Sequence, residues 1–333
     1  MNVSCEAHVD MQNGLGGSMK YTPLKLRPCY KEYLWGGDRL KKEFHKPDAP
    51  VVTAESWELS GHPDGPSLTE DGRSITQLGA LDRDGFWGVA CTGAEFPILV
   101  KLIDAEKDLS IQVHPSEETA LPGERGKAEM WYIMDCEPQA YLYLGFSRRI
   151  SKDEFLERAR DGSICQVLNR VPVSKGDVFY IQPGTIHAIG AGILIAEIQQ
   201  NSNTTFRVYD YQRKDGEGKL RPLHLERAAK VVDYEPIIPH HCRANSCVTF
   251  PGFSITEMFR CDHFRAHRID VREEITLRCD GTSFQHLLCV EGNGTVRVGG
   301  RGYPFSRGDS YFLPAALGEY KIQGKCRVLL SRV

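Results

Sequence analysis

Three polar side chains alternate with apolar residues in the segment LSIQVHP, residues 109–115. Ser110, Gln112 and His114 occupy every second position of this segment. Successive side chains of a β-strand point to opposite faces, so these three share one face. In a small β-barrel, one of the two faces lines the lumen. The segment therefore predicts a strand that presents a hydroxyl, an amide and an imidazole to a cavity.

Two further segments supply the remaining donors for a metal ion. Lys127 and Glu129 are two positions apart in GKAEMWYI, and His187 follows a Pro-Gly turn in PGTIHAIG. Two histidines and one carboxylate leave an open coordination position on a divalent metal, as catalytic zinc requires. Taken singly, each residue also has a structural interpretation, such as a histidine that satisfies a turn. The shared strand parity favours a metal site formed by His114, Glu129 and His187, with Gln112 beside them.

A second polar cluster suits an anionic or hydroxylated ligand. Glu197 follows an apolar strand, and Arg207 begins the aromatic strand FRVYDY. The amides between them belong to Gln199, Asn201 and Asn203. Arginine pairs well with phosphate, although residue type alone favours an exposed polar turn over such a site. Lys101 lies in the apolar run PILVKLI, where a charge is costly unless it reaches solvent or meets an anion, and we favour an anion.

The pattern of short strands predicts an all-β architecture. Runs of Val, Ile, Tyr and Phe, interrupted by Gly, Pro, Asn and Asp, dominate from about residue 95 onward, as in barrels and sandwiches of antiparallel strands. Helices are expected to be the minority, with candidates at 151–161, where Ser151 and Glu154 form a capping box, and at 223–232. The stretch YEPIIPHH after the second helix predicts a domain junction.

Two segments resemble each other and support a division of the chain. Residues 175–189 and 307–322 each contain Gly-Asp, an aromatic-aliphatic strand, a proline and a turn into another strand. Strand-like runs at 129–135 and 284–294 precede them. The first copy contains His187, and the second has no histidine at the corresponding place. Two related barrel units are therefore expected, of which only the first binds a metal.

The composition restricts the class of protein. The chain has 333 residues, 41% of them hydrophobic, and a net charge of -3, which suits a globular protein of two domains. The 41 basic residues are spread among 44 acidic ones, which argues against a nucleic-acid partner. No apolar run reaches the roughly 20 residues of a membrane span, and no export signal opens the chain, so a cytoplasmic location is expected. Eleven cysteines without a CxxC pair predict reduced thiols.

Six segments together resemble the type I mannose-6-phosphate isomerase family, in particular its short bacterial form. They are YLWGG, ESWELSGHP, PILVKLIDAEKDLSIQVHP, GKAEMWYI, PGTIHAIG and EIQQNSNTTFRVYDY. The resemblance implies a double cupin, that is, two jelly-roll barrels with a short helical insertion at 148–170. The expected units are a disordered extension over 1–20, a catalytic metal-binding cupin over 21–236, and a cupin-like barrel without metal ligands over 237–333.

The resemblance also implies a site and a reaction. One Zn²⁺ per chain would be bound by His114, Glu129 and His187, with Gln112 as a fourth ligand or a neighbour. The implied pocket residues are Lys101, Ser110, Lys127, Glu197 and Arg207. The implied reaction interconverts mannose 6-phosphate and fructose 6-phosphate through an enediol, and a metal can stabilise the charge that develops.

The roles of the pocket residues in this reaction leave alternatives. Lys127, whose pKa a nearby zinc would lower, and Glu197 are the alternatives for the proton-transfer base. Arg207 either binds the phosphate with Lys101 and Ser110 or stabilises the enediolate.

Two other functions remain open from the residues alone. Two histidines and a carboxylate also form the facial triad of non-haem iron oxygenases, although such an enzyme has no special need for Lys127 and Arg207. A sugar-phosphate-binding cupin without turnover would keep the pocket and would shift its melting temperature on binding. The isomerase is the favoured interpretation, with a small sugar phosphate as its partner, no nucleic acid or membrane, and a monomer or homodimer as its assembly.

Overall fold

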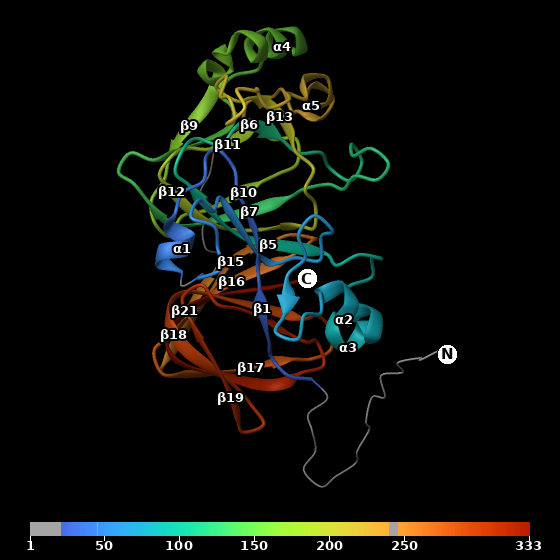
Figure 1. The fold of residues 1–333 in the computed structure, drawn as a ribbon, viewed down its shortest axis with the longest axis vertical. Helices are drawn as coiled ribbons and strands as arrows, with labels where there is room; N and C mark the ends of the chain where they lie inside the picture. The colour runs from blue at the N-terminus through green and yellow to red at the C-terminus, as the bar shows by residue number, and fades with distance from the viewer. Residues whose placement is uncertain (1–20, 45, 240–245) are drawn as a thin grey trace, which may run out of the picture.

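The computed structural model describes residues 21–44, 46–239 and 246–333. The extension expected over 1–20 lies outside these residues. Strands dominate the described chain and helices are few, in agreement with the predicted class. Figure 1 shows an elongated molecule in which the green and yellow strands of the middle of the chain lie above the red strands of its C-terminal part.

Two sheets form the upper part of the molecule. The first has the order β10 (Val178–Ile181), β7 (Glu129–Cys136), β12 (Ile193–Gln200), β5 (Ile98–Ala105), β3 (Glu55–Leu59) and β2 (Cys29–Lys31). The second has the order β13 (Phe206–Tyr209), β6 (Ile111–Val113), β11 (His187–Ile189), β8 (Tyr141–Phe146) and β9 (Leu168–Pro172). Residues of both sheets, such as Trp131 and Ile195 from the first and Leu142 and Ile189 from the second, share one apolar core. The two sheets therefore pack face to face.

The third sheet has ten strands and forms the lower part. Its main path is β14 (Ser246–Phe250), β15 (Phe253–Arg260), β16 (Arg265–Val271), β21 (Gly318–Arg332), β18 (Gln285–Val298), β20 (Ser310–Leu313), β1 (Leu24–Arg27) and β4 (Leu68–Thr69). β17 (Glu274–Cys279) pairs with β21, and β19 (Arg301–Ser306) pairs with β18. The N-terminal strand β1 thus belongs to the sheet of the C-terminal part. Within the described residues, hydrogen bonding leaves all three sheets open, and the two-barrel division stays a prediction.

The central strands β5 and β12 are buried along their whole length. One face of β5 presents Val100 and Leu102 to a core that also contains Leu288 and Leu329 of the ten-stranded sheet. The other face presents Lys101 and Ile103 to the interior between the two upper sheets. Burial on both faces explains why PILVKLI is almost continuously apolar.

The helices are short and lie outside the sheets. They are α1 (Arg39–Glu43), α2 (Ile75–Leu81), α3 (Arg83–Phe86), α4 (Lys152–Asp161) and α5 (Leu225–Val231), with a 3-10 helix at Ser163–Val167. The predicted helix at 151–161 is confirmed as α4, and Ser151 accepts a hydrogen bond from the Glu154 main-chain N–H. The predicted helix at 223–232 is shorter than expected, because His224 has a φ of -118° and a ψ of 45°, outside the helical region, so that α5 begins only at Leu225.

The two segments predicted to be related form the same turn. Gly176 and Gly308 both have positive φ, at 96° and 92°. Asp177 then accepts a hydrogen bond from the Ser174 main-chain N–H at 2.7 Å, and Asp309 accepts one from Ser306 at 2.9 Å. The strands that follow, β10 and β20, pair antiparallel with β7 and β18 respectively. The sequence similarity therefore corresponds to a repeated local structure.

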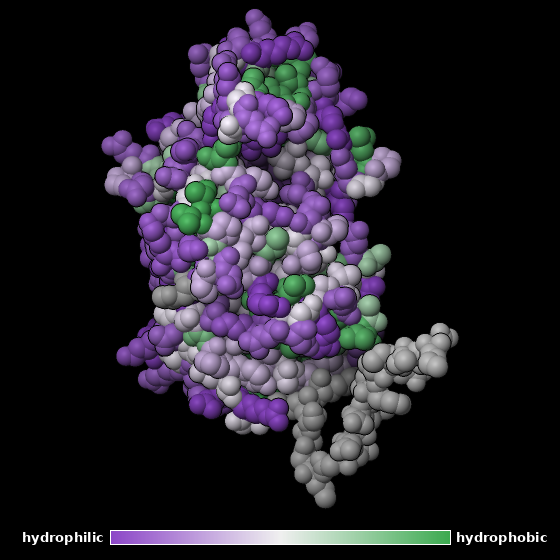
Figure 2. All heavy atoms as spheres, in the orientation of Figure 1, coloured by the Kyte–Doolittle hydropathy of each residue, from purple (hydrophilic) through white to green (hydrophobic). Residues whose placement is uncertain are grey.

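The surface carries scattered apolar residues. Figure 2 shows a face that is mostly hydrophilic, with small hydrophobic groups separated from one another. No helix among the described residues is both long enough and apolar enough to cross a membrane.

Candidate metal centre and adjoining pocket

Neighbouring strands bring His114, Glu129 and His187 together. His114 follows β6, while Glu129 and His187 are the first residues of β7 and β11. Their potential ligand atoms all lie within 4.8 Å of one another, and none of the three side chains is more than 1% exposed. Glu129 Oε1 is 3.6 Å from His114 Nε2 and 3.3 Å from His187 Nε2.

Hydrogen bonds to carbonyl oxygens orient both imidazoles. His114 Nδ1 is 2.9 Å from the carbonyl oxygen of Thr204, and His187 Nδ1 is 2.9 Å from that of Thr185. A carbonyl oxygen only accepts, so each Nδ1 carries the hydrogen. Burial lowers the pKa of both histidines, which favours the neutral rings. Each Nε2 therefore directs a lone pair at the Glu129 carboxylate.

This arrangement fits a metal ion. Three electron-pair donors that face one another repel unless positive charge lies close to them, and here the Lys127 ammonium supplies part of that charge from the cavity side. Glu129 Oε2 pairs with the Lys127 ammonium, whereas Glu129 Oε1 has no hydrogen-bond donor within the described chain. Burial opposes its ionisation, but the positive charge of Lys127, 3.0 Å away, and other neighbouring groups together outweigh burial and lower the pKa of Glu129. Two neutral imidazoles and one carboxylate are a donor set for a divalent transition metal with an open position.

Gln112 lies beside this centre. Its amide nitrogen is 3.3 Å from His187 Nε2, and its residue pairs with His187 across β6 and β11. In that orientation the amide N–H faces the imidazole lone pair. A half-turn of the amide would present its oxygen instead. Gln112 can therefore act as a fourth metal ligand or as a neighbour of the metal, which are the two alternatives that the sequence left open.

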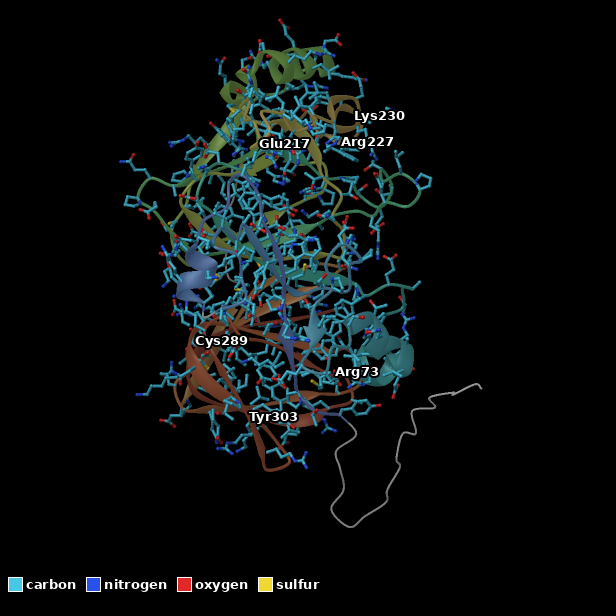
Figure 3. All side chains as sticks on the ribbon, in the orientation of Figure 1. Arg73, Glu217, Arg227, Lys230, Cys289 and Tyr303 are labelled. Carbon is cyan, nitrogen blue, oxygen red and sulfur yellow. The ribbon has the colours of Figure 1, made fainter. Side chains whose placement is uncertain are left out.

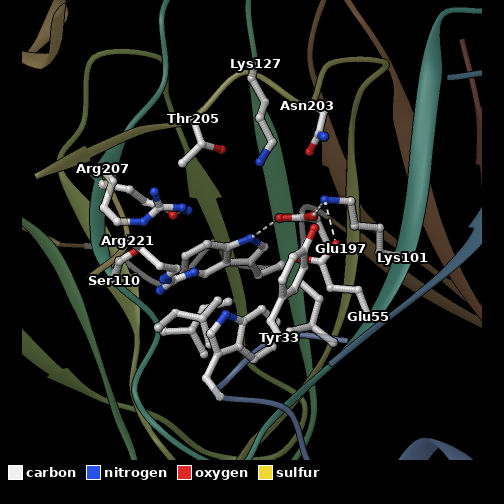
Figure 4. Close-up of a pocket in the computed structure, with 16 residues that line it drawn as sticks. Tyr33, Glu55, Lys101, Ser110, Lys127, Glu197, Asn203, Thr205, Arg207 and Arg221 are labelled. Carbon is white, nitrogen blue, oxygen red and sulfur yellow. Dashed lines mark hydrogen bonds and ion pairs between the residues drawn. The ribbon is translucent and has the colours of Figure 1, made fainter. Parts of the chain in front are cut away.

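A cavity of about 240 Å³ adjoins the three donors. Gln112 and Lys127 line it and contact the donors from the cavity side. All six residues that the sequence placed around a ligand line it: Lys101, Ser110, Gln112, Lys127, Glu197 and Arg207. The other polar lining residues are Tyr33, Glu55, Asn203, Thr205 and Arg221. Figure 4 shows Lys101, Glu55 and Glu197 on one side of the cavity and Arg207 and Arg221 on the other.

The acidic side of the cavity is internally balanced. Lys101 Nζ is 3.2 Å from Glu197 and 3.5 Å from Glu55. Burial opposes the charge of Lys101, but Glu55 and Glu197 outweigh it and raise the pKa of the lysine. The indole of Trp131 donates to Glu197 at 2.9 Å, and that of Trp57 donates to Glu55 at 2.7 Å. The anion expected near Lys101 is therefore available within the protein itself.

The basic side has an excess of positive charge. Arg221 makes two hydrogen bonds to Asp210, at 2.7 and 2.6 Å, and Arg213 also pairs with Asp210. Arg207 has no ion pair with any described residue, and its guanidinium donates to the carbonyl oxygen of Pro222 at 2.9 Å. Burial and the nearby charge of Arg221 lower the pKa of Arg207. An anion placed between Arg207 and Arg221 would relieve this imbalance.

Not every residue of the predicted second cluster reaches the cavity. The side chain of Gln199 donates to the carbonyl oxygens of Gln200 and Ser202, at 2.8 and 2.6 Å, and so stabilises a turn. Asn203 lines the cavity and donates to Asp64 at 2.9 Å.

The sequence did not single out Glu55 or Arg221. Glu55 shares strand parity with Trp57, but only the pairing of β3 with β5 places it beside Lys101.

Two protein-family descriptions match separate parts of this chain. The family model "Phosphomannose isomerase type I, catalytic domain" matches residues 24–143, and "Mannose-6-phosphate isomerase, cupin domain" matches residues 254–333. Mannose-6-phosphate isomerase ManA of Bacillus subtilis is 37% identical over 327 residues, which cover 95% of this chain and 100% of the relative. The chain belongs to the type I phosphomannose isomerase family.

Solved structures share the fold of this phosphomannose isomerase family member. The crystal structure of mannose 6-phosphate isomerase from Bacillus subtilis has a TM-score of 0.87 and 34% identity, covering 93% of this chain and 99% of that one. A mannose 6-phosphate isomerase bound with zinc and yttrium has a TM-score of 0.72 at 16% identity, covering 93% and 98% of the two chains. The fold is thus the cupin-type fold of the family, with mostly β-sheet and few helices.

Proposed function

We propose that the chain is a zinc-dependent aldose-ketose isomerase that interconverts mannose 6-phosphate and fructose 6-phosphate. One observation carries the proposal: a cavity joins a buried donor set for a metal to a pair of arginines, of which one has no ion-pair partner within the described residues. The printed names of the relatives support the reaction. The same arginine makes an oxygenase a poorer fit, because oxygen activation needs no phosphate site.

His114, Glu129 and His187 would hold one zinc ion, with Gln112 beside it. Bound there, zinc would act as a Lewis acid for the charge that develops on the sugar oxygens. The neutral imidazoles, and the Glu129 oxygen that has no hydrogen-bond donor among the described residues, support this assignment. The zinc in a solved structure of the same fold supports the choice of metal.

Arg207 and Arg221 would bind the phosphate, aided by the hydroxyl group of Ser110. Their side chains share one side of the cavity (Figure 4). Lys101 was expected to take part, and it lines the cavity, but it is already paired with Glu55 and Glu197. We therefore assign Lys101 to holding these two carboxylates in place.

Isomerisation moves one proton from C2 to C1 of the opened sugar and one from O2 to O1. We propose that Glu197 transfers the proton between C2 and C1. Trp131 and Lys101 contact the two oxygens of Glu197 and so orient its carboxylate at the cavity wall. Lys127 lies between the cavity and the donor set, 3.2 Å from His114 Nε2, where it can transfer the proton between the sugar oxygens O2 and O1. Arg207 binds the phosphate in this assignment, and enediolate stabilisation is its alternative role.

We also propose that each half of the chain is a cupin, the first over 21–236 and the second over 237–333. The repeated Gly-Asp turn and its paired strands support this division. The match of a cupin domain to residues 254–333 supports the second unit. Only the first unit contains the metal donors, so the second would support the fold.

A turnover assay tests the proposed reaction. The zinc-loaded protein should convert mannose 6-phosphate to fructose 6-phosphate, and unphosphorylated mannose should react far more slowly because it cannot use Arg207. Absence of turnover with mannose 6-phosphate in fully zinc-loaded protein would refute the proposed substrate. Oxygen consumption by iron-loaded protein would support the oxygenase instead.

A further inference from the structure

The segment Pro222–His224 holds Arg207 at three points. The Arg207 guanidinium donates to the carbonyl oxygen of Pro222 at 2.9 Å. The main-chain N–H of His224 donates to the carbonyl oxygen of Arg207 at 2.7 Å. The main-chain N–H of Arg207 donates to His224 Nδ1 at 3.1 Å. One short segment therefore fixes both the main chain and the side chain of this arginine.

The position of β13 explains why Arg207 needs these contacts. β13 is the edge strand of its sheet, with β6 as its hydrogen-bonded neighbour. An edge strand has one row of main-chain groups without a strand partner. At Arg207, the imidazole and the main chain of His224 take the place of the missing strand. α5 begins directly after His224 and packs against β13, which anchors the segment.

The contact with Nδ1 depends on the protonation of the imidazole. Nδ1 accepts the Arg207 N–H only while it carries no hydrogen of its own. A protonated ring has hydrogens on both nitrogens and would face the N–H as a second donor. The contact therefore exists in the neutral form of His224 and is lost when the ring is charged.

We propose that His224 is a positioning residue, whose neutral imidazole holds Arg207 where it binds the phosphate and releases it on protonation. The inference rests on the proposed function only for the identity of the phosphorylated ligand. It adds a residue that does not itself line the cavity of the metal centre.

The surroundings of His224 favour its neutral form. Burial and the positive charges of Arg207 on β13 and Arg227 on α5 lower the pKa of His224. Figure 3 shows Arg227 on α5 beside Lys230. The remaining titratable groups around the adjoining cavity are His62, Asp64 and Glu124. Glu124 is paired with Arg227, and Asp64 accepts a hydrogen bond from Asn203.

Two variants of His224 distinguish the effect of the hydrogen-bond acceptor from that of the titratable imidazole ring. His224→Asn places an amide oxygen near the position of Nδ1 and does not titrate, whereas His224→Leu removes the acceptor. The probe is inorganic phosphate, titrated calorimetrically into the zinc-loaded full chain. At pH 7.5 we expect His224→Leu to weaken binding about fivefold to tenfold, the usual effect of one hydrogen bond, and His224→Asn to restore most of it.

A double-mutant cycle tests whether His224 acts through Arg207. In an Arg207→Met background, His224→Leu should change phosphate binding less than about twofold, because the group that it positions is gone. Equal weakening in both backgrounds, an unchanged affinity in His224→Leu, or failure of the wild-type chain to bind phosphate would overturn the proposal. Melting temperatures of all variants check that they are folded.

The pH dependence gives a second test that does not need the leucine variant. The ratio of wild-type to His224→Asn affinity should be constant above about pH 6.5, the ordinary pKa of histidine, and should fall only below it as the imidazole becomes charged, because the surroundings lower the pKa of His224. Ionisation of phosphate and of the metal ligands is common to both proteins and cancels. A flat ratio would overturn the proposal.

Phosphate binding without sugar turnover would refute the proposed function alone, and turnover with a flat ratio would refute this inference alone.

Discussion

Arg207 and Arg221 share one side of the cavity but differ in how their charges are compensated. Arg221 has Asp210, whereas Arg207 has only the carbonyl oxygen of Pro222 as a side-chain acceptor within the described chain. The phosphate group of a bound ligand would thus form an ion pair with Arg207 in preference to Arg221. The sequence indicated Arg207 because arginine pairs well with phosphate and because the family resemblance implied a pocket residue at this position. It did not predict Arg221, which lies in a loop where no periodicity indicates direction.

Replacing Arg207 by methionine should raise KM for mannose 6-phosphate about 10- to 100-fold. This range corresponds to the roughly 1.5–3 kcal/mol of a hydrogen bond to a charged group. The steady-state assay is compared with Arg149→Met, which removes the same charge at a site that is 77% exposed. Unchanged KM and kcat in Arg207→Met would rule out both roles proposed for this residue.

The three metal donors show how far residue types alone can be interpreted. Strand parity correctly grouped Ser110, Gln112 and His114 on one face, because Ile111 and Val113 face an apolar core while Ser110 and Gln112 line the cavity on the other side. The relation of His187 to this group required the pairing of β11 with β6, which a single sequence does not encode. Their role as ligands stays a prediction until a metal is measured.

At the scale of elements, the predictable parts were those with local signals. α4 has a capping residue and an apolar stripe, and its predicted limits agree with the structure within one residue. α1 and α3 have only 5 and 4 residues, too few for a helical period to appear. α2 was not predicted, although the sequence does contain its local signal, the capping box of Ser74 and Gln77.

A buried histidine on β18 gives the sheet a dependence on pH. His286 is fully buried, and its Nε2 is 2.6 Å from Ser310 Oγ, which itself donates to the carbonyl oxygen of Glu58 at 3.1 Å. Burial lowers the pKa of His286 to about 3, whereas an unfolded histidine has a pKa near 6.5. Between these values the unfolded chain binds a proton that the folded chain does not. Stability should therefore fall as pH falls below about 6.5.

His286→Gln should remove this part of the acid dependence. Below about pH 6, the free energy of unfolding of the wild type should fall by about 1.4 kcal/mol more per pH unit than that of the variant. Urea unfolding at several values between pH 5 and 7 measures the difference. Parallel curves for the two proteins would contradict the account, since all other titrating groups are shared.

At the scale of the whole molecule, a buried ion pair joins the upper and lower parts. Lys46 Nζ is 2.7 Å from Glu58 on β3 and 3.0 Å from the carbonyl oxygen of Gly308 in the C-terminal part. The lysine is 6% exposed and the glutamate 0%. β3 also carries Glu55 and Trp57, so the ten-stranded sheet supports a strand that contributes to the cavity.

Breaking this pair from one side should destabilise the protein more than removing it entirely. Lys46→Met leaves Glu58 as an uncompensated buried charge and should cost about 3–5 kcal/mol of unfolding free energy. The double variant Lys46→Met/Glu58→Leu should recover most of that loss. Chemical denaturation measures both, and equal or additive losses would show that the pair does not act as a unit.

The overall division of the molecule was only partly visible in the sequence. The related turns at Asp177 and Asp309 were predictable because both follow the same local pattern. The pairing of β1 with β20 was not, since it joins residues such as Leu24 and Phe312 that lie at opposite ends of the chain. Long-range strand pairing leaves no local signal for periodicity to detect.

One metal ion held by His114, Glu129 and His187 should support isomerisation in the adjoining cavity. Metal-depleted protein is titrated with zinc while bound zinc and turnover of mannose 6-phosphate are measured on the same samples, with Glu129→Gln as the matched variant. We predict that activity is absent without metal, rises in proportion to bound zinc, and reaches its maximum at one ion per chain, while Glu129→Gln binds zinc more weakly. Full turnover in metal-free protein, or one tightly bound zinc per chain without turnover, would contradict the account.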